Sequence, residues 1–218
     1  MGSEMCIRDS IHSERWGMIL LFSGITILLN FFSDILALTG AVATVWCIYF
    51  FRDPERIPPQ NDGCLISPAD GKILPIQKII PPPELGLGKK EYFRVSIFMN
   101  IFDVHVNRIP CDGVVSRLHY HPGKFFNASF DKASVHNERM AITITTQPGQ
   151  SIGVVQIAGL IARRICCDLK KEKHVRSGDR FGIIKFGSRV DLYFSDQFKL
   201  AIVEKQKVLA GKTVIARL

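Results

Sequence analysis

Apolar residues form two long runs near the start of the chain. Residues 17–32 and 35–51 are almost entirely apolar, and Asp34 is the only charged residue between positions 17 and 51. Each run is slightly shorter than the roughly 20 apolar residues that cross a bilayer. The pattern predicts a helical pair that turns at Ser33-Asp34 and associates with a membrane, either as a hairpin or as one tilted helix with an interfacial remainder.

The residues that flank these runs favour one orientation. Arg15 and Trp16 precede the first run, Trp46 lies near the end of the second, and Arg52 follows it. Interfacial aromatics and flanking positive charges favour both ends on the cytoplasmic side. A cleaved signal peptide is the competing interpretation, but no small-residue cleavage site with a polar mature start follows. A buried helix pair in a soluble protein is the other alternative.

Beyond residue 63 the pattern changes to short runs of Val, Ile, Phe and Tyr between Gly turns. Such runs predict strands, including residues 64–76 as strand, turn and strand, 92–99, 140–145, 151–159 and 181–194. Two Val-x-x-Gly-x-x hairpins, at residues 175–181 and 208–214, suggest an internal repeat of hammerhead type. We therefore expect a mainly β fold (α+β at most), with a sandwich- or barrel-like domain that has hammerhead-type hairpins, behind an apolar helical membrane segment.

The chain divides into three parts on this basis. Residues 1–15 are a tail and possible artefact without clear periodicity, which we leave out of the fold prediction. Residues 16–52 are expected to form the membrane-associating segment, and residues 53–218 the β domain. Residues 53–59 (DPERIPP) join them as a rigid, extended connector, because proline fixes φ and disfavours helix in the residue before it.

Charge and cysteine content narrow the class of partner. The 28 Lys and Arg exceed the 20 Asp and Glu, for a formal net charge of +8. This excess fits an anionic lipid or an acidic substrate, and the absence of a zinc finger or RNP signature makes nucleic acid the weaker choice. The six cysteines form no C-x-x-C pair, so we expect neither a disulfide framework nor a metal site.

Candidate chemistry lies in three places. Gly187-Ser188 interrupts two strands and indicates either a β-bulge or a strained peptide bond that the Ser188 hydroxyl attacks. In residues 100–110, polar Asp103, His105 and Asn107 alternate with valines, which fits a solvated strand face or a general base at His105. Asp70 lies in a Pro-x-Asp-Gly turn, where its local role is to form the turn.

A set of motifs occurs in a fixed order along the chain. They are residues 51–56 (FRDPER), 67–71 (SPADG), 98–110 (FMNIFDVHVNRIP), 120–127 (YHPGKFFN), 137–139 (NER) and 186–188 (FGS). Together, and behind an apolar segment, they resemble the short, bacterial and archaeal-type phosphatidylserine decarboxylase proenzymes. The resemblance covers the chain from about residue 16 to its end.

The resemblance implies a proenzyme that cuts itself between Gly187 and Ser188. Ser188 Oγ attacks the Gly187 carbonyl, the resulting ester undergoes β-elimination, and the dehydroalanine that remains hydrolyses to a covalent pyruvoyl group and ammonia. A β chain (1–187) and an α chain (188–218) form the heterodimer, and the resemblance leaves higher oligomers open. The pyruvoyl carbonyl forms a Schiff base with the substrate amine and accepts electrons as carbon dioxide leaves.

The resemblance also assigns roles to individual residues, at the positions where this chain matches the family motifs. Asp70 and His105 match motif residues expected to be catalytic. Longer members have a second histidine three residues after the first, where this chain has Arg108, so the base is His105 as first choice and His136 in reserve. The resemblance also makes Arg108, Arg139 and His136 candidates for binding the substrate carboxylate or phosphate.

The expected partners are phosphatidylserine and an anionic membrane, on the cytoplasmic side of the cell membrane and without nucleic acid. Three rivals stay open at this stage. One is a lipoyl- or biotinyl-type carrier, with Lys132 in a lipoylation-like tripeptide. Another is a pyruvoyl enzyme acting on a soluble amino acid, and the third is a decarboxylase of a different phosphoserine lipid.

Overall fold

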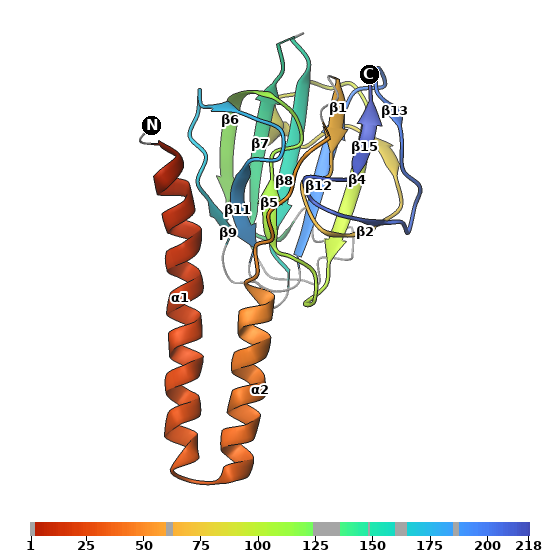
Figure 1. Cartoon of the computed structure of the whole chain (residues 1–218). Helices are drawn as coiled ribbons and strands as arrows, with labels where there is room; N and C mark the ends of the chain where they lie inside the picture. Colours follow the sequence, from red (N-terminus) through yellow and green to blue (C-terminus); the bar gives the residue numbers. More distant parts are fainter. Residues whose placement is uncertain (1–2, 60–62, 124–135, 148, 160–164, 185–187) are drawn as a thin grey trace. The chain divides into compact units, whose positions relative to one another are not determined.

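The structure is a computed structural model that describes residues 3–59, 63–123, 136–147, 149–159, 165–184 and 188–218. The chain divides by its internal contacts into two compact units, Met1–Pro54 and Glu55–Leu218. Each unit is described by itself below. The first contains the helices and the second contains the strands (Figure 1).

The first unit is a pair of helices, α1 (Ser3–Asn30) and α2 (Asp34–Phe50). Ser33 caps α2, because its Oγ accepts a hydrogen bond from the Ile35 N–H at 3.3 Å. The two helices contact each other along their length, and Thr26 and Thr44 share a hydrogen bond of 3.0 Å between their hydroxyls. The predicted helical pair with its turn at Ser33-Asp34 is therefore confirmed, and α1 extends back to Ser3.

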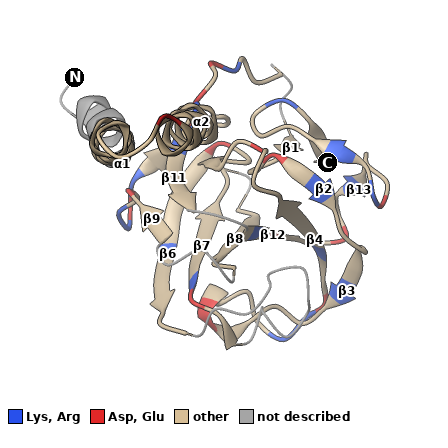
Figure 2. Ribbon diagram, turned by 90° about the horizontal axis from the view of Figure 1, so that it is seen from below, with Lys and Arg blue, Asp and Glu red and all other residues tan. Residues whose placement is uncertain are grey.

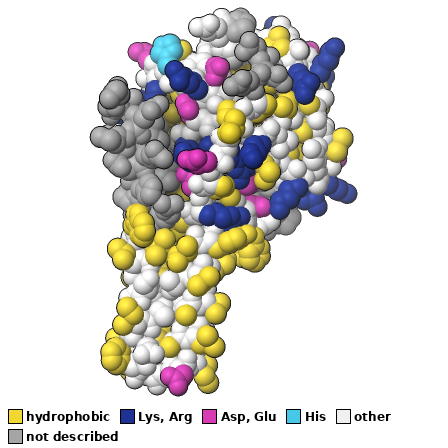
Figure 3. All heavy atoms as spheres, in the orientation of Figure 1, with side chains coloured by type: hydrophobic (Ala, Val, Ile, Leu, Met, Phe, Trp, Pro, Cys, Tyr) yellow, Lys and Arg dark blue, Asp and Glu magenta, His cyan; other side chains and the backbone are white. Residues whose placement is uncertain are grey.

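Most of the large apolar side chains on these helices are exposed. Phe31, Phe32 and Ile35 at the turn have exposed fractions of 80%, 74% and 76%. Hydrophobic side chains likewise cover much of the helical unit in Figure 3. Within the described residues, neither helix has both the length and the hydropathy of a membrane-crossing segment.

The second unit is built on one nine-stranded antiparallel sheet, which curls in the view of Figure 2. Its strand order is β10-β6-β7-β8-β12-β4-β2-β14, and β3 also pairs with β4. The bounds are β10 (His174–Val175), β6 (Gly113–His121), β7 (Arg139–Thr145), β8 (Ser151–Ile157), β12 (Ser188–Phe194), β4 (Tyr92–Met99), β2 (Gly71–Ile73), β14 (Lys207–Val208) and β3 (Gln77–Ile79).

Two three-stranded sheets complete the unit. One has the order β1-β15-β13, and the other has the order β5-β11-β9. Their bounds are β1 (Cys64–Ile66), β15 (Val214–Arg217), β13 (Lys199–Leu200), β5 (Val106–Arg108), β11 (Arg180–Ile184) and β9 (Ile165–Cys167). A mainly β fold is therefore confirmed. Figure 2 shows Lys and Arg on β3 and β13 of this unit.

Several strand predictions are confirmed. Tyr92–Met99 is a strand over the predicted residues. Residues 64–76 contain strand, turn and strand as predicted, in β1 and β2. These two strands do not pair with each other, because β1 pairs with β15 whereas β2 pairs with β4 and β14. The local pattern does not give these partners, since strand pairing over long sequence separations is decided by tertiary contacts.

The nine-stranded sheet buries both of its faces. Val190, Leu192 and Phe194 of β12 point into the main hydrophobic core with Ile97 of β4 and Ile142 of β7. On the second face, Leu85 from the 3-10 helix η1 (Pro83–Leu85) packs with residues of β7, β8 and β12 (Ala141, Val155, Ile157 and Tyr193). Alternate residues of β12 therefore enter two different buried environments.

The two Gly turns of the predicted repeat occupy comparable places. Gly178 and Gly211 have φ values of 86° and 75°, which an L side chain rarely adopts. The first lies between β10 and β11, and the second between β14 and β15. Each turn therefore links a strand of the nine-stranded sheet to a strand of a three-stranded sheet.

Candidate active site

Ser188 is the first residue of β12, a central strand that pairs with β4 on one side and β8 on the other. Its side chain has no exposed surface. It lies on the core face of the sheet, because it alternates with Arg189 and is in phase with Val190 and Leu192. Its Oγ lies 4.0 Å from the Sδ of Met99, its cross-strand neighbour. The hydroxyl is therefore a buried group at the end of a rigid strand.

β11 and β12 are separate strands, as the break at Gly187-Ser188 predicted. β11 belongs to the sheet β5-β11-β9, whereas β12 belongs to the nine-stranded sheet. Gly187 itself lies outside the described residues, as does Lys132. The chain thus changes sheets between Ile184 and Ser188, close to the start of β12.

His105 lies beside the end of β11. Its carbonyl accepts a hydrogen bond of 3.4 Å from the Ile184 N–H, and its imidazole is fully buried. The Nδ1 is 2.9 Å from the Asp103 carbonyl oxygen. A carbonyl can only accept, so Nδ1 carries the proton and the neutral ring has its lone pair on Nε2. This tautomer suits a general base.

Residues 103–107 do not form a solvated strand face. Asp103, His105 and Asn107 are all buried, and only residues 106–108 of this segment are in a strand. Asp103 Oδ2 accepts a hydrogen bond from the Asn100 N–H, which closes the turn before it. The polar residues that alternate with valines therefore do form one group, but the group is buried, and the interpretation as a solvated strand face is wrong.

Two buried amides meet on the core side of Ser188. Gln156 of β8 donates from Nε2 to Asn107 Oδ1 at 2.7 Å, and Asn107 Nδ2 lies 3.7 Å from Met99 Sδ. Gly182 leaves room for this contact, since a Cβ there would lie 3.2 Å from Gln156 Nε2. Sequence reasoning missed Gln156; the only signal was a polar residue inside the apolar run 151–159.

Asp70 is held by two groups. Arg56 donates to both of its carboxylate oxygens at 2.7 Å, and the Ala210 N–H donates to Oδ1 at 2.7 Å. The carboxylate is therefore paired in a bidentate manner and almost fully buried. No contact among the described residues joins Asp70 to His105 or Ser188. Its observed contacts fasten the connector residue Arg56 to the β14–β15 turn.

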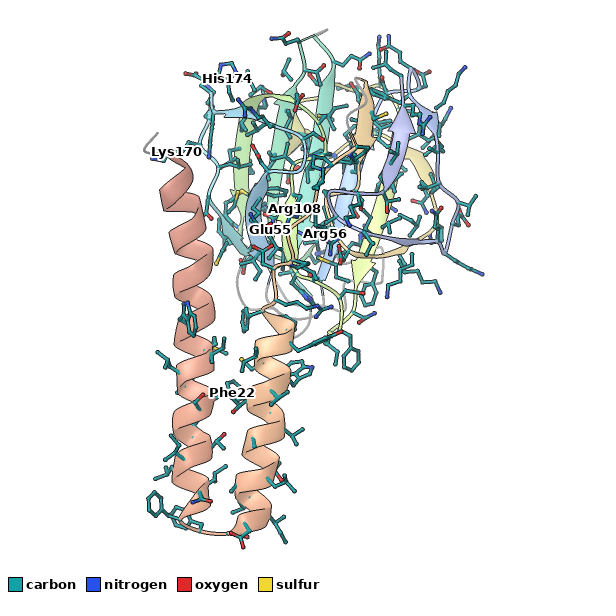
Figure 4. The ribbon with its side chains drawn as sticks, in the orientation of Figure 1. Phe22, Glu55, Arg56, Arg108, Lys170 and His174 are labelled. Atoms are coloured by element: carbon teal, nitrogen blue, oxygen red, sulfur yellow. The ribbon has the colours of Figure 1, made fainter. Side chains whose placement is uncertain are left out.

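Arg108 occupies the position where a second histidine was expected. Its Nη1 donates to the Gly178 carbonyl at 3.0 Å, and a Cβ on Gly211 would lie 2.9 Å from its Cδ. Its side chain therefore reaches both of the equivalent Gly turns. Figure 4 shows Arg56 and Arg108 in the same region of the β unit.

Arg139 lies on the second face of the sheet, opposite Ser188. It pairs with Ile157, which also pairs with Arg189, so Arg139 and Arg189 share that face. Its guanidinium forms an ion pair with Glu84 of η1. Burial alone raises the pKa of the Glu84 carboxyl, but the hydrogen bond and charge of Arg139 outweigh it and lower that pKa below its usual value.

A second ion pair lies on the same face and was also missed. Arg189 and Asp191 of β12 are bound through two contacts, Nε to Oδ1 at 2.6 Å and Nη2 to Oδ2 at 2.7 Å. Both side chains are almost completely buried. Burial, with the charge of Asp191 as a smaller cause, raises the pKa of the neighbouring Tyr193 phenol well above its ordinary value. The spacing i, i+2 in an apolar strand was the available signal.

The remaining candidates lie elsewhere. His136 is exposed, whereas the residues that follow it, Asn137 to Arg139, are buried. Asn137 Nδ2 donates to the Ala158 carbonyl at 2.7 Å, which anchors this motif to the end of β8. Cys47, Cys64, Cys111, Cys166 and Cys167 are free thiols, and burial raises the pKa of the Cys111 thiol to about 12. The same part holds no cluster of metal-ligating side chains.

Comparison with known proteins decides the family. The profile described as "Phosphatidylserine decarboxylase" matches residues 43–216. The chain belongs to the phosphatidylserine decarboxylase family. It is 54% identical over 206 residues to the phosphatidylserine decarboxylase proenzyme of Rickettsia africae (strain ESF-5), covering 94% of this chain and 89% of the relative. The proenzymes of Rickettsia typhi (strain Wilmington) and Rickettsia bellii (strain OSU 85-389) are 53% identical with the same coverage of both chains.

Proenzymes of the phosphatidylserine decarboxylase family carry a pyruvoyl group that they form by self-cleavage. The surroundings of Ser188 fit such a group. The serine side chain would lose its hydroxyl and become the methyl of the group, so that the group needs no more room than Ser188, whose Oγ is 4.0 Å from Met99 Sδ. The methyl would face this thioether, and Asn107 Nδ2, 3.7 Å from the same sulfur, is a polar group nearby.

Proposed function

We propose that this chain decarboxylates phosphatidylserine to phosphatidylethanolamine with a pyruvoyl group that it makes from Ser188, by cutting itself between Gly187 and Ser188. Membership of the family supports the reaction, which makes the protein a carboxy-lyase made as a zymogen. The observation that carries the assignment to this bond is the place of Ser188. It is a fully buried hydroxyl at the start of a central strand, beside the break between two sheets.

His105 is the proposed base for self-cleavage. Its Nδ1 proton is committed to the Asp103 carbonyl, so Nε2 is the nitrogen that can take a proton. Its backbone binds Ile184, the last described residue before Ser188 in the chain. Because His105 and Ser188 are buried, water is kept away from them, and this protects the intermediates of self-cleavage from premature hydrolysis. Once formed, the pyruvoyl group supplies a ketone carbonyl that condenses with the substrate amine and accepts the electron pair left by carbon dioxide.

Asp70, Arg108, Arg139 and His136 are proposed in supporting roles. Asp70 holds Arg56 and the Ala210 backbone, and we assign it to positioning the connector and the turn at Gly211. Arg108 and His136 stay candidates for the substrate phosphate or carboxylate, since Arg108 offers a guanidinium and His136 is exposed. Arg139 stays a candidate of the same kind, although its ion pair with Glu84 favours a structural role.

The two products of the cut, residues 1–187 and 188–218, are proposed to stay together as one heterodimer. β12 lies between β4 and β8, β15 lies between β1 and β13, and β14 pairs with β2. The short chain therefore contributes strands to two sheets and cannot leave without breaking both. Denaturant should be needed to separate the chains.

The helical unit is the proposed membrane anchor, on the cytoplasmic side of the cell membrane. Its exposed apolar side chains and its single charge between residues 17 and 51 support this. Excess Lys and Arg elsewhere would favour an anionic leaflet. Flotation of the full chain with anionic vesicles tests the proposal, and a Phe31→Lys/Phe32→Lys variant that floats as well as wild type would contradict it.

For the domain as a whole we propose a sandwich- or barrel-like form with hammerhead-type hairpins. The support is the equivalence of the turns at Gly178 and Gly211, each of which links the nine-stranded sheet to a three-stranded one.

Mass analysis of the expressed protein under denaturing conditions tests the proposed cut. Wild type should yield a fragment of residues 188–218 with a blocked, pyruvoyl N-terminus, and Ser188→Ala should stay uncut. Ser96→Ala is the matched control, because Ser96 is another fully enclosed serine, on the neighbouring strand β4. It should be cut like wild type. A folded wild-type chain that stays intact, or a cut in Ser188→Ala, would overturn the proposal.

A further inference from the structure

Two buried amide side chains connect opposite walls of the core beside Ser188. Gln156 belongs to β8 of the nine-stranded sheet, and Asn107 belongs to β5 of the sheet β5-β11-β9. Neither has any exposed surface, and the hydrogen bond from Gln156 Nε2 to Asn107 Oδ1 is 2.7 Å long. The side chain of Gln156 lies on the same face of the sheet as that of Ser188, since Gln156 pairs with Val190.

The sulfur of Met99 determines which way the Asn107 amide faces. Asn107 Nδ2 is 3.7 Å from Met99 Sδ, and Ser188 Oγ is 4.0 Å from the same atom. A thioether can accept a hydrogen bond weakly and cannot donate one, so it favours the nitrogen of the amide on this side. The oxygen of Asn107 then faces Gln156, which must donate. The amino group of Asn107 therefore lies beside the sulfur that Ser188 Oγ also contacts.

The amide pair is poorly explained by stability alone. Among the described residues, Gln156 Oε1 has no hydrogen-bond partner, although it is buried. A buried polar group without a partner destabilises a fold, and two apolar side chains of the same shape would serve packing better. A half-satisfied polar pair next to a buried nucleophile therefore points to a role in the chemistry.

We propose that Gln156 is a positioning residue for the reactions at residue 188. Its hydrogen bond holds the Asn107 amide so that Nδ2 donates to Met99 Sδ, and the sulfur in turn keeps Ser188 Oγ in one position for the attack on the Gly187 carbonyl. The inference rests on the proposed self-cleavage at Ser188. It adds Gln156 of β8, which family motifs and local sequence did not single out, and it gives a role to Asn107 of β5.

The test follows self-cleavage over time in cell-free synthesis with a labelled pulse. Gln156→Met removes the amide at similar length, and Asn107→Leu removes the donor. Each should slow the cut by about tenfold or more, as expected when one oriented donor is lost. The double variant should be no slower than Asn107→Leu alone, because Gln156 acts through Asn107. Gln150→Met is the matched control: it removes a 2.8 Å amide bond to Gln197 at the other end of β8 and should cut at the wild-type rate.

A second variant provides a readout that a structural role would not change. Asn107→Asp keeps the shape but loses the N–H donor, and a carboxyl group can donate again once it is protonated. The ratio of its cleavage rate to that of wild type should rise as pH falls from about 7 to about 5, toward the carboxyl titration range. Melting temperatures of all variants are measured in the uncut Ser188→Ala background, which separates folding from cleavage.

Three outcomes would overturn the inference. They are a wild-type cleavage rate in Gln156→Met, effects that multiply in the double variant, and an Asn107→Asp ratio that does not change with pH. In each case the wild-type chain still cuts and Ser188→Ala does not, so the proposed function survives. If the wild-type chain is not cut, the proposed function itself fails.

Discussion

Ser188 and Arg189 are neighbours in β12, yet they enter two different kinds of buried polar environment. On the core face, Ser188 Oγ contacts the thioether of Met99, and the Gln156 amide on the same face is partly unsatisfied among the described residues. On the second face, Arg189 is bound to Asp191 by two short contacts. The charges of Arg189 and Asp191 neutralise each other on one face, whereas on the other face the neutral amide of Gln156 keeps an oxygen without a partner among the described residues. Within this one strand, the core face therefore carries the proposed site, and the second face carries a structural ion pair.

The largest effect should come from His105 on the core face. His105→Asn removes the proposed base while keeping a polar side chain, and self-cleavage should slow by about 10²- to 10⁴-fold. The time course of chain cutting measures this, with the melting temperature of the uncut form as a check on folding. His174→Asn makes the same change at an exposed histidine of β10 and should leave the cut unaffected. A His105→Asn chain that cuts normally would move the base elsewhere, with exposed His136 as the next candidate.

The second face should respond in stability and not in chemistry. Asp191→Leu leaves the buried Arg189 without its carboxylate and should cost about 3–5 kcal/mol in the free energy of unfolding. The double variant Arg189→Met/Asp191→Leu should recover most of that loss, because it removes both charges of the pair. Chemical denaturation in the Ser188→Ala background measures both. If the double variant is as unstable as the single one, the ion pair has a role beyond its own neutralisation.

The smallest effect should come from the ion pair between Glu84 and Arg139. Glu84→Gln should cost about 1–3 kcal/mol, the range for a hydrogen bond to a charged group. The pKa of Glu84 is lowered in the folded state, so its contribution is present above the ordinary value of 4.5 and is lost as pH falls through the folded pKa. The stability difference between wild type and Glu84→Gln should therefore shrink below about pH 4.5.

A matched control for this pair is available on the surface. Lys171 and Glu172 are 3.8 Å apart with side chains 69% and 82% exposed. Glu172→Gln should change the free energy of unfolding by less than about 1 kcal/mol, because water screens exposed pairs. Equal effects at Glu84 and Glu172 would mean that the Glu84 pair also contributes little.

Some of this molecule followed directly from its sequence. The helical pair, the strand Tyr92–Met99 and the change of strand at Ser188 were predicted from apolar patterns, because local periodicity reports on burial. The order of motifs indicated the family and directed attention to Ser188 and His105. Gln156, Arg189 and Asp191 were missed, because their local signals, a polar residue in an apolar run and an i, i+2 spacing, do not by themselves separate a buried polar residue from one on a solvated strand face.

Tertiary structure decided what these residues contact. Asp70 reaches Arg56 and Ala210, and Arg108 reaches Gly178; the sequence separations are as large as 140 positions. β1 and β2 join different sheets although they are close in the chain. Period-two alternation determined which residues of β12 share a face. The sequence does not show which face of β12 lies in the site with Ser188. That is decided when β4, β8 and β5 pack around it, because the pairing partners come from distant parts of the chain.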